Sequence, residues 1–535
     1  MQLVGRMLVV CLLLSGYTLA TTEDFHEAVE HGSLPTVRRI IEARPDAVEE
    51  RAPDGSVPLH LAAANGQAAM AKLLLHEGAE VNAETRRGRT ALELALEGGH
   101  RDVAEVLLAA GAQVSPRAVN ELLWEGEFEL AELVGAHAES LDIVAAAALG
   151  DVGRVSELLE ADPSLLETTG RPFGDTPLHW AAARGQADAV RLLVEEGANP
   201  RAGRYGTPLH WAAAMGRLEA TRLLLRAGAS ANENDSLLAT PLHCAAAGGN
   251  KETILALLSG GAMVDGAEGN TEASQLPPWG TPLHWAAGMG RAQAADVLIA
   301  AGADVNAPAA YFATPLHVLH HEDYRGAPGL MARVARDLGL APAPLMVVLV
   351  WPSKEGGAER LDSFHMRRSV LTYRAESALT PLHWAAHMGE EAVAELLLAK
   401  GADPNAADEL FGAPLHWAAG GGHPDTVRLL LREGARLNVT TAFFGRPLHW
   451  AARTGQTSVT DLLLRADDDV SSRDPNGNTA LHLAARYGHA GLASFLLQAG
   501  APYDAANKRG KTPLQVAMEE GHDEVAELLE GGSVR

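Results

Sequence analysis

Histidine and tryptophan stand side by side in two nearly identical decapeptides of the chain. Residues 207–216 read TPLHWAAAMG and residues 281–290 read TPLHWAAGMG. A histidine could serve as a metal ligand or as a general acid or base, and an exposed indole could bind a ligand. The repetition raises a second interpretation, in which both residues belong to a structural unit.

The decapeptide recurs along the chain at a fixed spacing. Its second position advances in steps of 33 residues in four runs, which are Pro58 and Ala91, then Pro208 and Pro241, then Pro282 and Pro315, then Pro381, Pro414, Pro447, Ala480 and Pro513. Such a period is typical of a solenoid, in which each repeat packs on its neighbours.

These motifs resemble those of a known family. The T-P-L-H-x-A-A signature, the Gly after it, the L-L-L run and the closing G-A-x-x-N segment resemble the ankyrin repeat over nearly the whole chain beyond residue 20. The resemblance implies an all-α solenoid of about fifteen stacked units, each a helix-turn-helix followed by a β-hairpin. It also implies protein partners, whose identity depends on variable surface residues.

The residues of one unit follow from local physics. Thr207 suits a helix N-cap, and Pro208 suits the first helical position, where a missing N–H costs nothing. His210 then falls at the third helical position, from which a capping-box side chain reaches back to the cap. Glu93 and Gln515 stand at the same position of their own units, and these are the residue types that a capping box uses.

This geometry argues against a metal or catalytic role for the histidines. Equivalent residues of stacked helices lie about 8–10 Å apart, whereas zinc ligands lie within about 2.3 Å of one ion. One histidine per repeat therefore cannot assemble a zinc site. The tryptophans of the LHW motif are likewise interpreted as packing between repeats, and they are Trp180, Trp211, Trp285, Trp384, Trp417 and Trp450.

The array divides into segments. Residues 24–50 and 142–167 share the pattern of a starting unit, and residues 116–140 form a helix pair without the motif. The predicted organisation is a first array over 21–140, a second over 141–340 and a C-terminal part with its cap over 380–535. Residues 341–379 contain the strand-like APLMVVLVWPS and SVLTYR, so this segment is either a long inserted finger or a degenerate repeat.

Aromatic residues occupy the predicted hairpin tips of the central units. The terminal units carry ordinary turn pairs such as Asp54-Gly55 and Asn476-Gly477. The central tips carry Leu238 and eight candidate partner-binding residues: Phe173, Tyr205, Trp279, Tyr311, Phe312, Phe411, Phe443 and Phe444. Either these side chains pack against adjacent hairpins or they form a contact stripe for a protein partner.

A second constellation could bind a metal. His317, His320, His321, Glu322 and Asp323 crowd into seven positions, and His317 with His321 forms an i, i+4 pair. His317 also occupies the capping position of its own motif. The alternative function is therefore a metal-dependent activity housed in an insertion over residues 315–379.

Composition and the first residues bear on partners and location. The 535-residue chain has a formal net charge of −25 and no run of Lys or Arg, so nucleic acid is not an expected partner. Residues 1–20 combine one positive charge, an apolar run and small residues at Thr18 and Ala20, as in a secretory signal peptide. We expect a periplasmic or secreted monomer without stable membrane insertion after cleavage. A cytoplasmic protein, or one anchored through its N-terminal segment, is the alternative.

The sequence shows no motif of an enzyme. It lacks a Gly-rich phosphate loop, a nucleophile elbow, an H-E-x-x-H pair and a paired-Cys motif. Its two cysteines are Cys11, inside the predicted signal peptide, and Cys244, which replaces Trp in TPLHCAAAGG and is interpreted as a small buried hydrophobe. The sequence therefore predicts a non-catalytic protein–protein interaction scaffold without a cofactor or metal.

Overall fold

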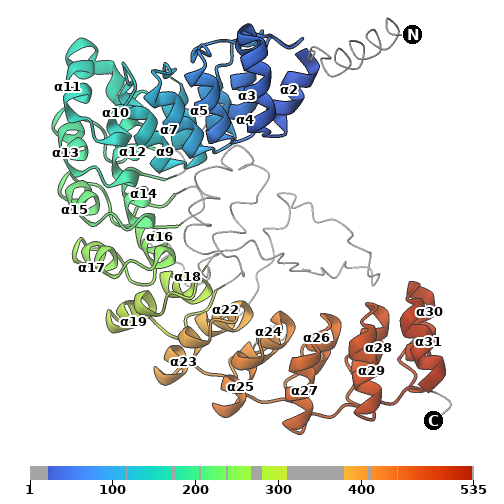
Figure 1. The fold of residues 1–535 in the computed structure, drawn as a ribbon. Helices are drawn as coiled ribbons and strands as arrows, with labels where there is room; N and C mark the ends of the chain where they lie inside the picture. Colours follow the sequence, from blue (N-terminus) through green and yellow to red (C-terminus); the bar gives the residue numbers. More distant parts are fainter. Residues whose placement is uncertain are drawn as a thin grey trace, which may run out of the picture. The chain divides into compact units, whose positions relative to one another are not determined.

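A computed structural model of the chain describes residues 22–115, 117–169, 175–203, 206–235, 239–266, 280–309, 379–407, 412–442 and 444–532. These residues form short α-helices in pairs (Figure 1), and the β-structure among them is limited to three isolated bridges. The predicted all-α solenoid is confirmed. The predicted repeat at residues 314–340 lies outside the described residues.

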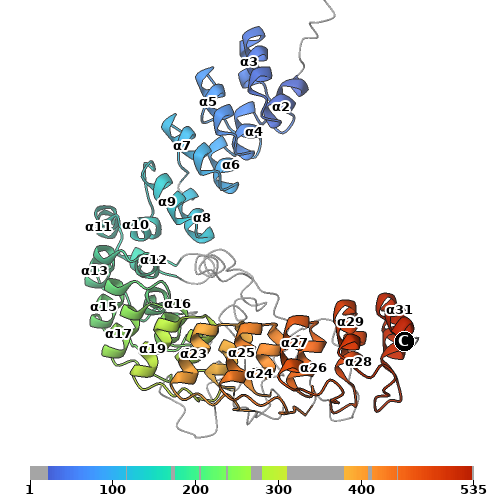
Figure 2. The same ribbon diagram turned by 60° about the horizontal axis from the view of Figure 1, so that its bottom comes forward.

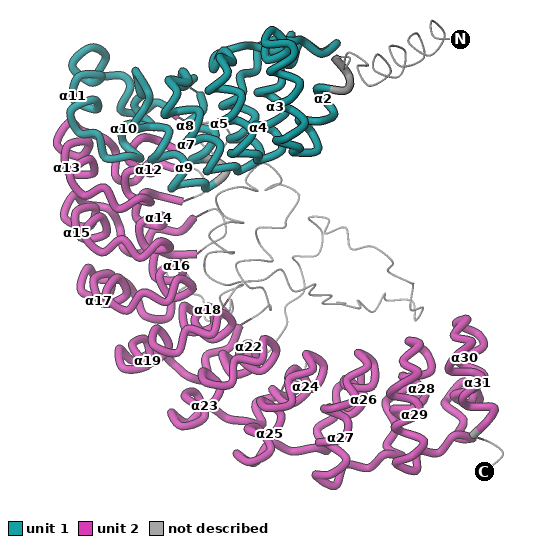
Figure 3. The backbone as a smooth tube through the Cα atoms, in the orientation of Figure 1, with its two compact units in different colours: residues 1–168, 328–333 teal, residues 169–327, 334–535 magenta. Residues whose placement is uncertain are grey.

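The helices group into two compact units, coloured separately in Figure 3. The first unit ends at Thr168. Its elements are α2 (Thr22–Glu30), α3 (Leu34–Ala43), the 3-10 helix η1 (Pro45–Glu49), α4 (Pro58–Ala64), α5 (Ala68–His76), α6 (Ala91–Glu97), α7 (Arg101–Ala109), α8 (Ala118–Glu125), α9 (Phe128–Gly135), α10 (Ile143–Leu149), α11 (Val152–Ala161) and the 3-10 helix η2 (Pro163–Glu167).

The second unit begins at Thr169. Its helices are α12 (Pro177–Arg184), α13 (Ala187–Glu195), α14 (Pro208–Ala214), α15 (Leu218–Arg226), α16 (Pro241–Gly248), α17 (Lys251–Ser259), α18 (Pro282–Gly288), α19 (Ala292–Ala300), α22 (Pro381–Met388), α23 (Glu391–Ala399), α24 (Pro414–Gly421), α25 (Pro424–Arg432), α26 (Pro447–Arg453), α27 (Thr457–Arg465), α28 (Ala480–Arg486), α29 (Ala490–Gln498), α30 (Pro513–Glu520) and α31 (Asp523–Gly532). Within this unit the even-numbered helices form one row and the odd-numbered helices a second (Figures 1 and 2). We call the even-numbered row the inner helices and the odd-numbered row the outer helices.

Sequence chemistry explains each helix pair. In α14, Pro208 is the first residue, and Gly216 follows the helix at a φ of 65°, in the left-handed region that favours glycine. Leu209, Ala212 and Ala213 are fully buried. The two alanines carry only methyl groups, and so they allow the inner helices of adjacent units to pack closely.

The two starting units share a design. The 3-10 helix η1 follows α3, and η2 follows α11, as their similar sequences predict. The motif-free pair predicted over 116–140 is present as α8 and α9. Helix α10 packs on both α8 and α9, which assigns residues 142–168 to the first unit, whereas the sequence predicted an array boundary near residue 140.

The stack of the second unit continues across residues 310–378. Helix α18 packs against α22 and α19 against α23, in the pairing that joins other neighbouring units. The Ala309 N–H donates to the Leu379 carbonyl oxygen over 2.9 Å, so the last described residue before this interval lies beside the first described residue after it. We expected a unit from residue 314 to stack between these helices. Helices α18 and α22 are in direct contact, and residues 310–378 between them lie outside the described residues, so the predicted finger or degenerate repeat over 341–379 stays a prediction.

Candidate partner-binding surface

Each PLH or ALH histidine in the described repeats makes two kinds of hydrogen bond. His210 Nδ1 accepts from the Thr207 backbone N–H over 3.1 Å and lies 2.9 Å from the Thr207 hydroxyl, so the predicted capping role is confirmed. Its Nε2 lies 3.1 Å from the carbonyl oxygen of Ala239, in the hairpin of the next unit. Because Nδ1 accepts, the proton stands on Nε2, which donates to that carbonyl. The sequence did not predict this second bond.

The bridge to the next unit recurs through the array. The distance from Nε2 to the carbonyl oxygen lies between 2.9 and 3.2 Å in these pairs: His60–Arg89, His179–Gly206, His210–Ala239, His243–Gly280, His284–Leu379, His383–Gly412, His416–Gly445, His449–Ser472 and His482–Lys511. The bridge from His284 to Leu379 joins the two sides of the insertion. Both ring nitrogens are occupied by the backbone, so these histidines are not available as ligands or bases.

Burial keeps the bridging histidines neutral. Desolvation lowers the pKa of His179, His210, His243, His284 and His416 to about 4, and that of His383 to about 3. A proton on Nδ1 would also face the N–H donor of the cap. The fold therefore selects the neutral ring with its proton on Nε2.

Glu93 and Gln515 replace the histidine in the two repeats that are not followed by a repeat with the same hairpin. The Thr90 N–H donates to the Glu93 carboxylate over 3.2 Å, and the Glu93 N–H donates to the Thr90 hydroxyl over 3.3 Å. Thr512 and Gln515 form the same reciprocal cap. The unit after Glu93 is the motif-free α8–α9 pair, and Gln515 lies in the last described unit. These two residues cap their helices without reaching a neighbour.

A second ladder ties the start of seven odd-numbered, outer helices in the two compact units to the preceding repeat. A side chain just before the outer helix donates to a carbonyl oxygen of the preceding inner helix over 2.8–3.1 Å in these pairs: Gln67–Glu30, His100–Ala64, Arg217–Ala183, Arg291–Ala247, His423–His387, His489–Arg453 and His522–Arg486. Sequence reasoning missed this ladder. Its signal is a long polar residue directly after the glycine that ends the inner helix.

The tryptophans of the LHW motif pack between units. The Trp211 ring lies 5.9 Å from the His179 ring and 5.7 Å from the Trp180 ring of the preceding unit. The contact with the preceding histidine recurs in the pairs His243–Trp285, His284–Trp384 and His416–Trp450. The predicted packing role is confirmed. Cys244 stands in place of one indole, and burial raises the pKa of its thiol, which keeps it protonated.

Phe444 is the one predicted partner-binding residue within the described ranges. Its ring is half-buried and lies 5.8 Å from the Trp450 ring, and the Arg453 guanidinium lies 4.8 Å from its centroid. This tip therefore packs on the inner helix of its own unit, and its contact with a partner stays a prediction. The other candidates lie outside the described residues, and they are Phe173, Tyr205, Trp279, Tyr311, Phe312, Phe411 and Phe443.

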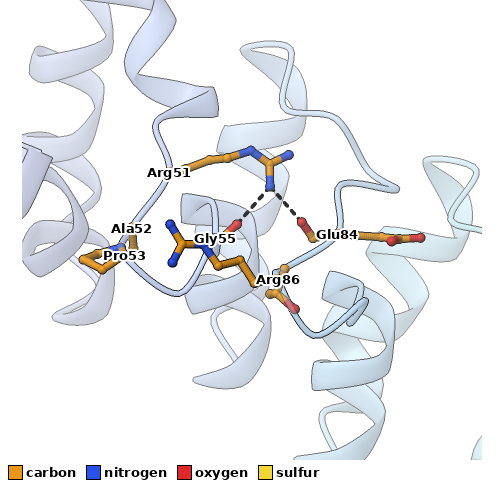
Figure 4. A pocket seen from close by; sticks show the side chains of 7 residues that line it. Arg51, Ala52, Pro53, Gly55, Glu84 and Arg86 are labelled. Atoms are coloured by element: carbon orange, nitrogen blue, oxygen red, sulfur yellow. Dashed lines mark hydrogen bonds between the residues drawn. The ribbon is translucent and has the colours of Figure 1, made fainter.

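An open hollow lies between the hairpin tips of the first two motif units (Figure 4). It is lined by Arg51, Ala52, Pro53, Gly55, Glu84, Thr85 and Arg86. The Arg51 guanidinium donates to the carbonyl oxygens of Gly55 and Glu84 over 3.0 and 2.7 Å and so joins the two hairpins. Arg473 makes the equivalent contacts near the C-terminus, with Gly477 and Ala506. The hollow is thus a product of hairpin stacking.

The metal alternative has no support within the described residues. They contain no group of three His, Cys, Asp or Glu side chains that could hold a metal ion. The cluster from His317 to Asp323 lies outside them, so this alternative stays a prediction. In the ranges that the structure describes, which exclude residues 1–21, no helix is long and apolar enough to cross a membrane.

A known protein family matches most of the chain. A family model for ankyrin repeats, in three copies, matches residues 25–118, 143–235, 227–309, 365–441, 407–474 and 448–533. A probable E3 ubiquitin-protein ligase, XBOS32 of Oryza sativa subsp. japonica, is 30% identical over 195 residues, which are 34% of this chain and 39% of the relative. The palmitoyltransferase akr1 of Aspergillus oryzae is 37% identical over 62 residues, 12% of this chain and 8% of that protein. The match thus spans less than half the length of either relative. Ankyrin repeats imply a protein-interaction scaffold.

Proposed function

The chain belongs to the ankyrin-repeat family, and we propose that it is a non-catalytic scaffold that binds a protein partner through its inner helices and hairpin tips. The two relatives are enzymes by name, but they match over 39% and 8% of their own lengths. Their activities are therefore no part of the proposal.

The distribution of roles within each unit carries this proposal. The cap, histidine, leucine and paired alanines of the motif are all buried or bonded to a neighbouring unit. The eighth motif position, counted from the cap, is at least partly exposed in most described repeats, and its residue type changes along the array. In order it is Ala64, Glu97, Ala183, Ala214, Ala247, Gly288, His387, Gly420, Arg453, Arg486 and Glu519. A fixed frame with variable exposed positions is how a repeat protein acquires a specific partner.

Affinity capture tests the proposal. The chain over 21–535 is immobilised and exposed to an envelope extract, and we expect a stoichiometric protein that soluble chain competes away. Replacing His387, Arg453 and Arg486 with Ala should release this protein. The matched control replaces Arg191, Arg222 and Arg428, which lie on outer helices and pair with carboxylates of their own helices. If both triple variants retain the partner equally, the inner helices are not its binding surface.

Export is the second part of the proposal. The basic residue, apolar run and small residues of positions 1–20 support secretion to the periplasm or medium, with the protein beginning at Thr21. N-terminal sequencing of the protein from the envelope fraction checks this. An intact Met1 would contradict cleavage and leave the cytoplasmic or anchored alternative.

The metal-dependent alternative has its own test. Its support is the spacing of His317, His321 and their acidic neighbours in the sequence. Elemental analysis of the purified full chain should find no stoichiometric transition metal if the scaffold proposal is complete. A metal that is lost on changing His317 and His321 to Ala would instead favour the alternative.

A further inference from the structure

The Arg453 guanidinium lies over two aromatic rings in the second compact unit. The guanidinium carbon lies 4.8 Å from the centroid of Phe444 and 5.3 Å from that of Tyr487. Phe444 comes from the hairpin of the same unit, and Tyr487 follows the inner helix of the next unit. Tyr487 is 37% exposed and Arg453 is half-buried, so the cluster reaches the surface. Such stacking orients a guanidinium while leaving its N–H groups free to donate in the ring plane.

The next unit provides an internal comparison. Arg486 occupies the same motif position as Arg453, and its guanidinium pairs with the carboxylate of Glu520 over 3.6 Å. The residue equivalent to Glu520, one unit earlier, is Tyr487. Among the described residues no carboxylate lies within ion-pair distance of Arg453. An aromatic ring thus replaces the counter-ion at this one place, in a chain whose formal net charge is −25.

The surroundings hold the cluster in position. The His489 Nε2 donates to the Arg453 carbonyl oxygen over 3.0 Å, which fixes the end of α26 relative to the next unit. The Phe444 N–H donates to the Thr441 hydroxyl over 3.0 Å, and the Phe444 ring meets the Trp450 ring edge to face. Arg453 is therefore ordered before any partner arrives, which lowers the entropy cost of binding.

We propose that Arg453, Phe444 and Tyr487 form an anchor for an Asp or Glu side chain of the protein partner. The free edge of the guanidinium binds the carboxylate, and the two rings cover apolar atoms beside it. This assignment rests on the proposed scaffold function and specifies where and by what chemistry the partner binds. Because the chain carries more acidic than basic residues, its surface repels an acidic segment of the partner at most places. Arg453, which has no carboxylate within ion-pair distance among the described residues, therefore makes this site selective for such a segment.

Selection from a random dodecapeptide library on the immobilised full chain tests the anchor. We expect the enriched peptides to carry Asp or Glu next to an apolar residue. Affinities of one enriched peptide and of its Asn or Gln version are then measured by titration. Replacement of the acidic residue should weaken binding at least tenfold, because a charge-assisted pair is lost.

Four variants separate anchoring from folding. Arg453→Gln removes the cation, and Tyr487→Glu gives Arg453 the internal counter-ion that Arg486 already has, so each should weaken peptide binding at least tenfold. Tyr487→Phe keeps the ring without a carboxylate, and Arg428→Gln removes a cation from an outer helix, where it pairs with Asp425. Each of these two variants should bind within twofold of the parent chain. Circular dichroism and the melting temperature verify that all four remain folded.

Three outcomes would overturn the anchor. The first is enrichment of peptides without acidic residues, and the second is unchanged affinity of Arg453→Gln. In these two cases peptide binding itself leaves the scaffold proposal standing. The third is a failure to enrich any peptide, and the capture experiment then decides the scaffold proposal separately.

Discussion

The two compact units contain the same kind of repeat, but different numbers of histidine bridges join adjacent repeats. In the first compact unit one described histidine bridge, from His60 to Arg89, joins two adjacent repeats, and Glu93 ends the series. In the second unit the bridge recurs from His179 through His482 and ends at Gln515. Helices α8 and α9 form without such a bridge among the described residues, so the bridge is not needed to make a helix pair. It serves to couple one pair to the next.

The largest expected difference between the two compact units is the loss of their folding stability at acid pH. A histidine with a pKa of 6.5 when unfolded and about 4 when folded stabilises the fold fully above pH 6.5, and this stability is lost as the pH falls towards 4. Each proton taken up on unfolding costs the second unit about 1.4 kcal/mol per pH unit. Asp175 and Asp468, whose pKa burial raises to about 7 and about 6, act in the opposite sense but are outnumbered.

Guanidinium unfolding followed by tryptophan fluorescence measures this effect in the second unit, because eight of the nine tryptophans lie beyond residue 168. Hydrogen exchange resolved by mass spectrometry follows the first compact unit. Its one described bridging histidine is His60, whose pKa burial also lowers. We expect a steep loss for the second unit and a shallow one for the first. Parallel losses in both units would remove the histidine bridges as the cause of the difference.

Core truncation should affect the two units alike. Leu415 and Leu59 hold the same motif position in the second and first unit, and both are fully buried. Replacing either with Ala should cost about 2–5 kcal/mol through lost burial and the cavity left behind. Chemical denaturation of each variant measures the cost. A much smaller loss for Leu59→Ala would indicate that the units differ in packing as well as in bridging.

A substitution that removes the bridge but keeps the cap should again have different effects on the stability of the two compact units. In His416→Gln the new side chain can cap the helix as Gln515 does, but it cannot reach the Gly445 carbonyl oxygen, 3.2 Å from Nε2. We expect a loss of about 1–3 kcal/mol, since a buried acceptor is left unsatisfied. Glu93→Gln is the control in the first unit and should stay within about 0.5 kcal/mol. If both changes are equally mild in denaturant titrations, the bridge adds nothing to capping.

The smallest effect concerns the hairpin tips. Phe444→Ser removes a half-buried ring from Trp450 and Arg453, which should cost about 0.5–1.5 kcal/mol. The tip of the first unit instead relies on Arg51, which donates to two backbone carbonyls. Thermal unfolding with and without a captured partner measures both roles of Phe444. A large loss of stability without a change in partner binding would assign the ring to packing alone.

Much of the fold follows from the sequence because each repeat is defined by local rules. The cap at Thr207, the proline after it and the left-handed Gly216 depend on residues within one unit, and a single sequence displays them. The bridge from His210 to Ala239 depends on where the next unit stands, which the fixed period implies but the residue type does not reveal. Glu93 and Gln515 could have indicated the bridge, because the histidine is replaced in the two repeats that no equivalent hairpin follows.

The candidate site was harder to predict for a related reason. The aromatic tips were recognised as unusual, but the partner of Phe444 is Arg453 on its own inner helix, and the second ring, Tyr487, belongs to the next unit. Neither relation follows a repeat-wide rule, because the eighth motif position changes from unit to unit. A property that depends on deviations from the repeat is visible only once the units are stacked.

The repeats on the two sides of residues 310–378 pack directly on each other, so a segment of another protein can be inserted between Ala309 and Leu379. The bridge from His284 to Leu379 and the bond between Ala309 and Leu379 close the gap, so any segment inserted here starts and finishes within hydrogen-bond distance. The entropy cost of closing such a loop grows only with the logarithm of its length, about 0.6 kcal/mol per doubling. The position is therefore suited to domain grafting, in which a reporter or binding module with adjacent termini replaces residues 310–378 and the flanking repeats are kept.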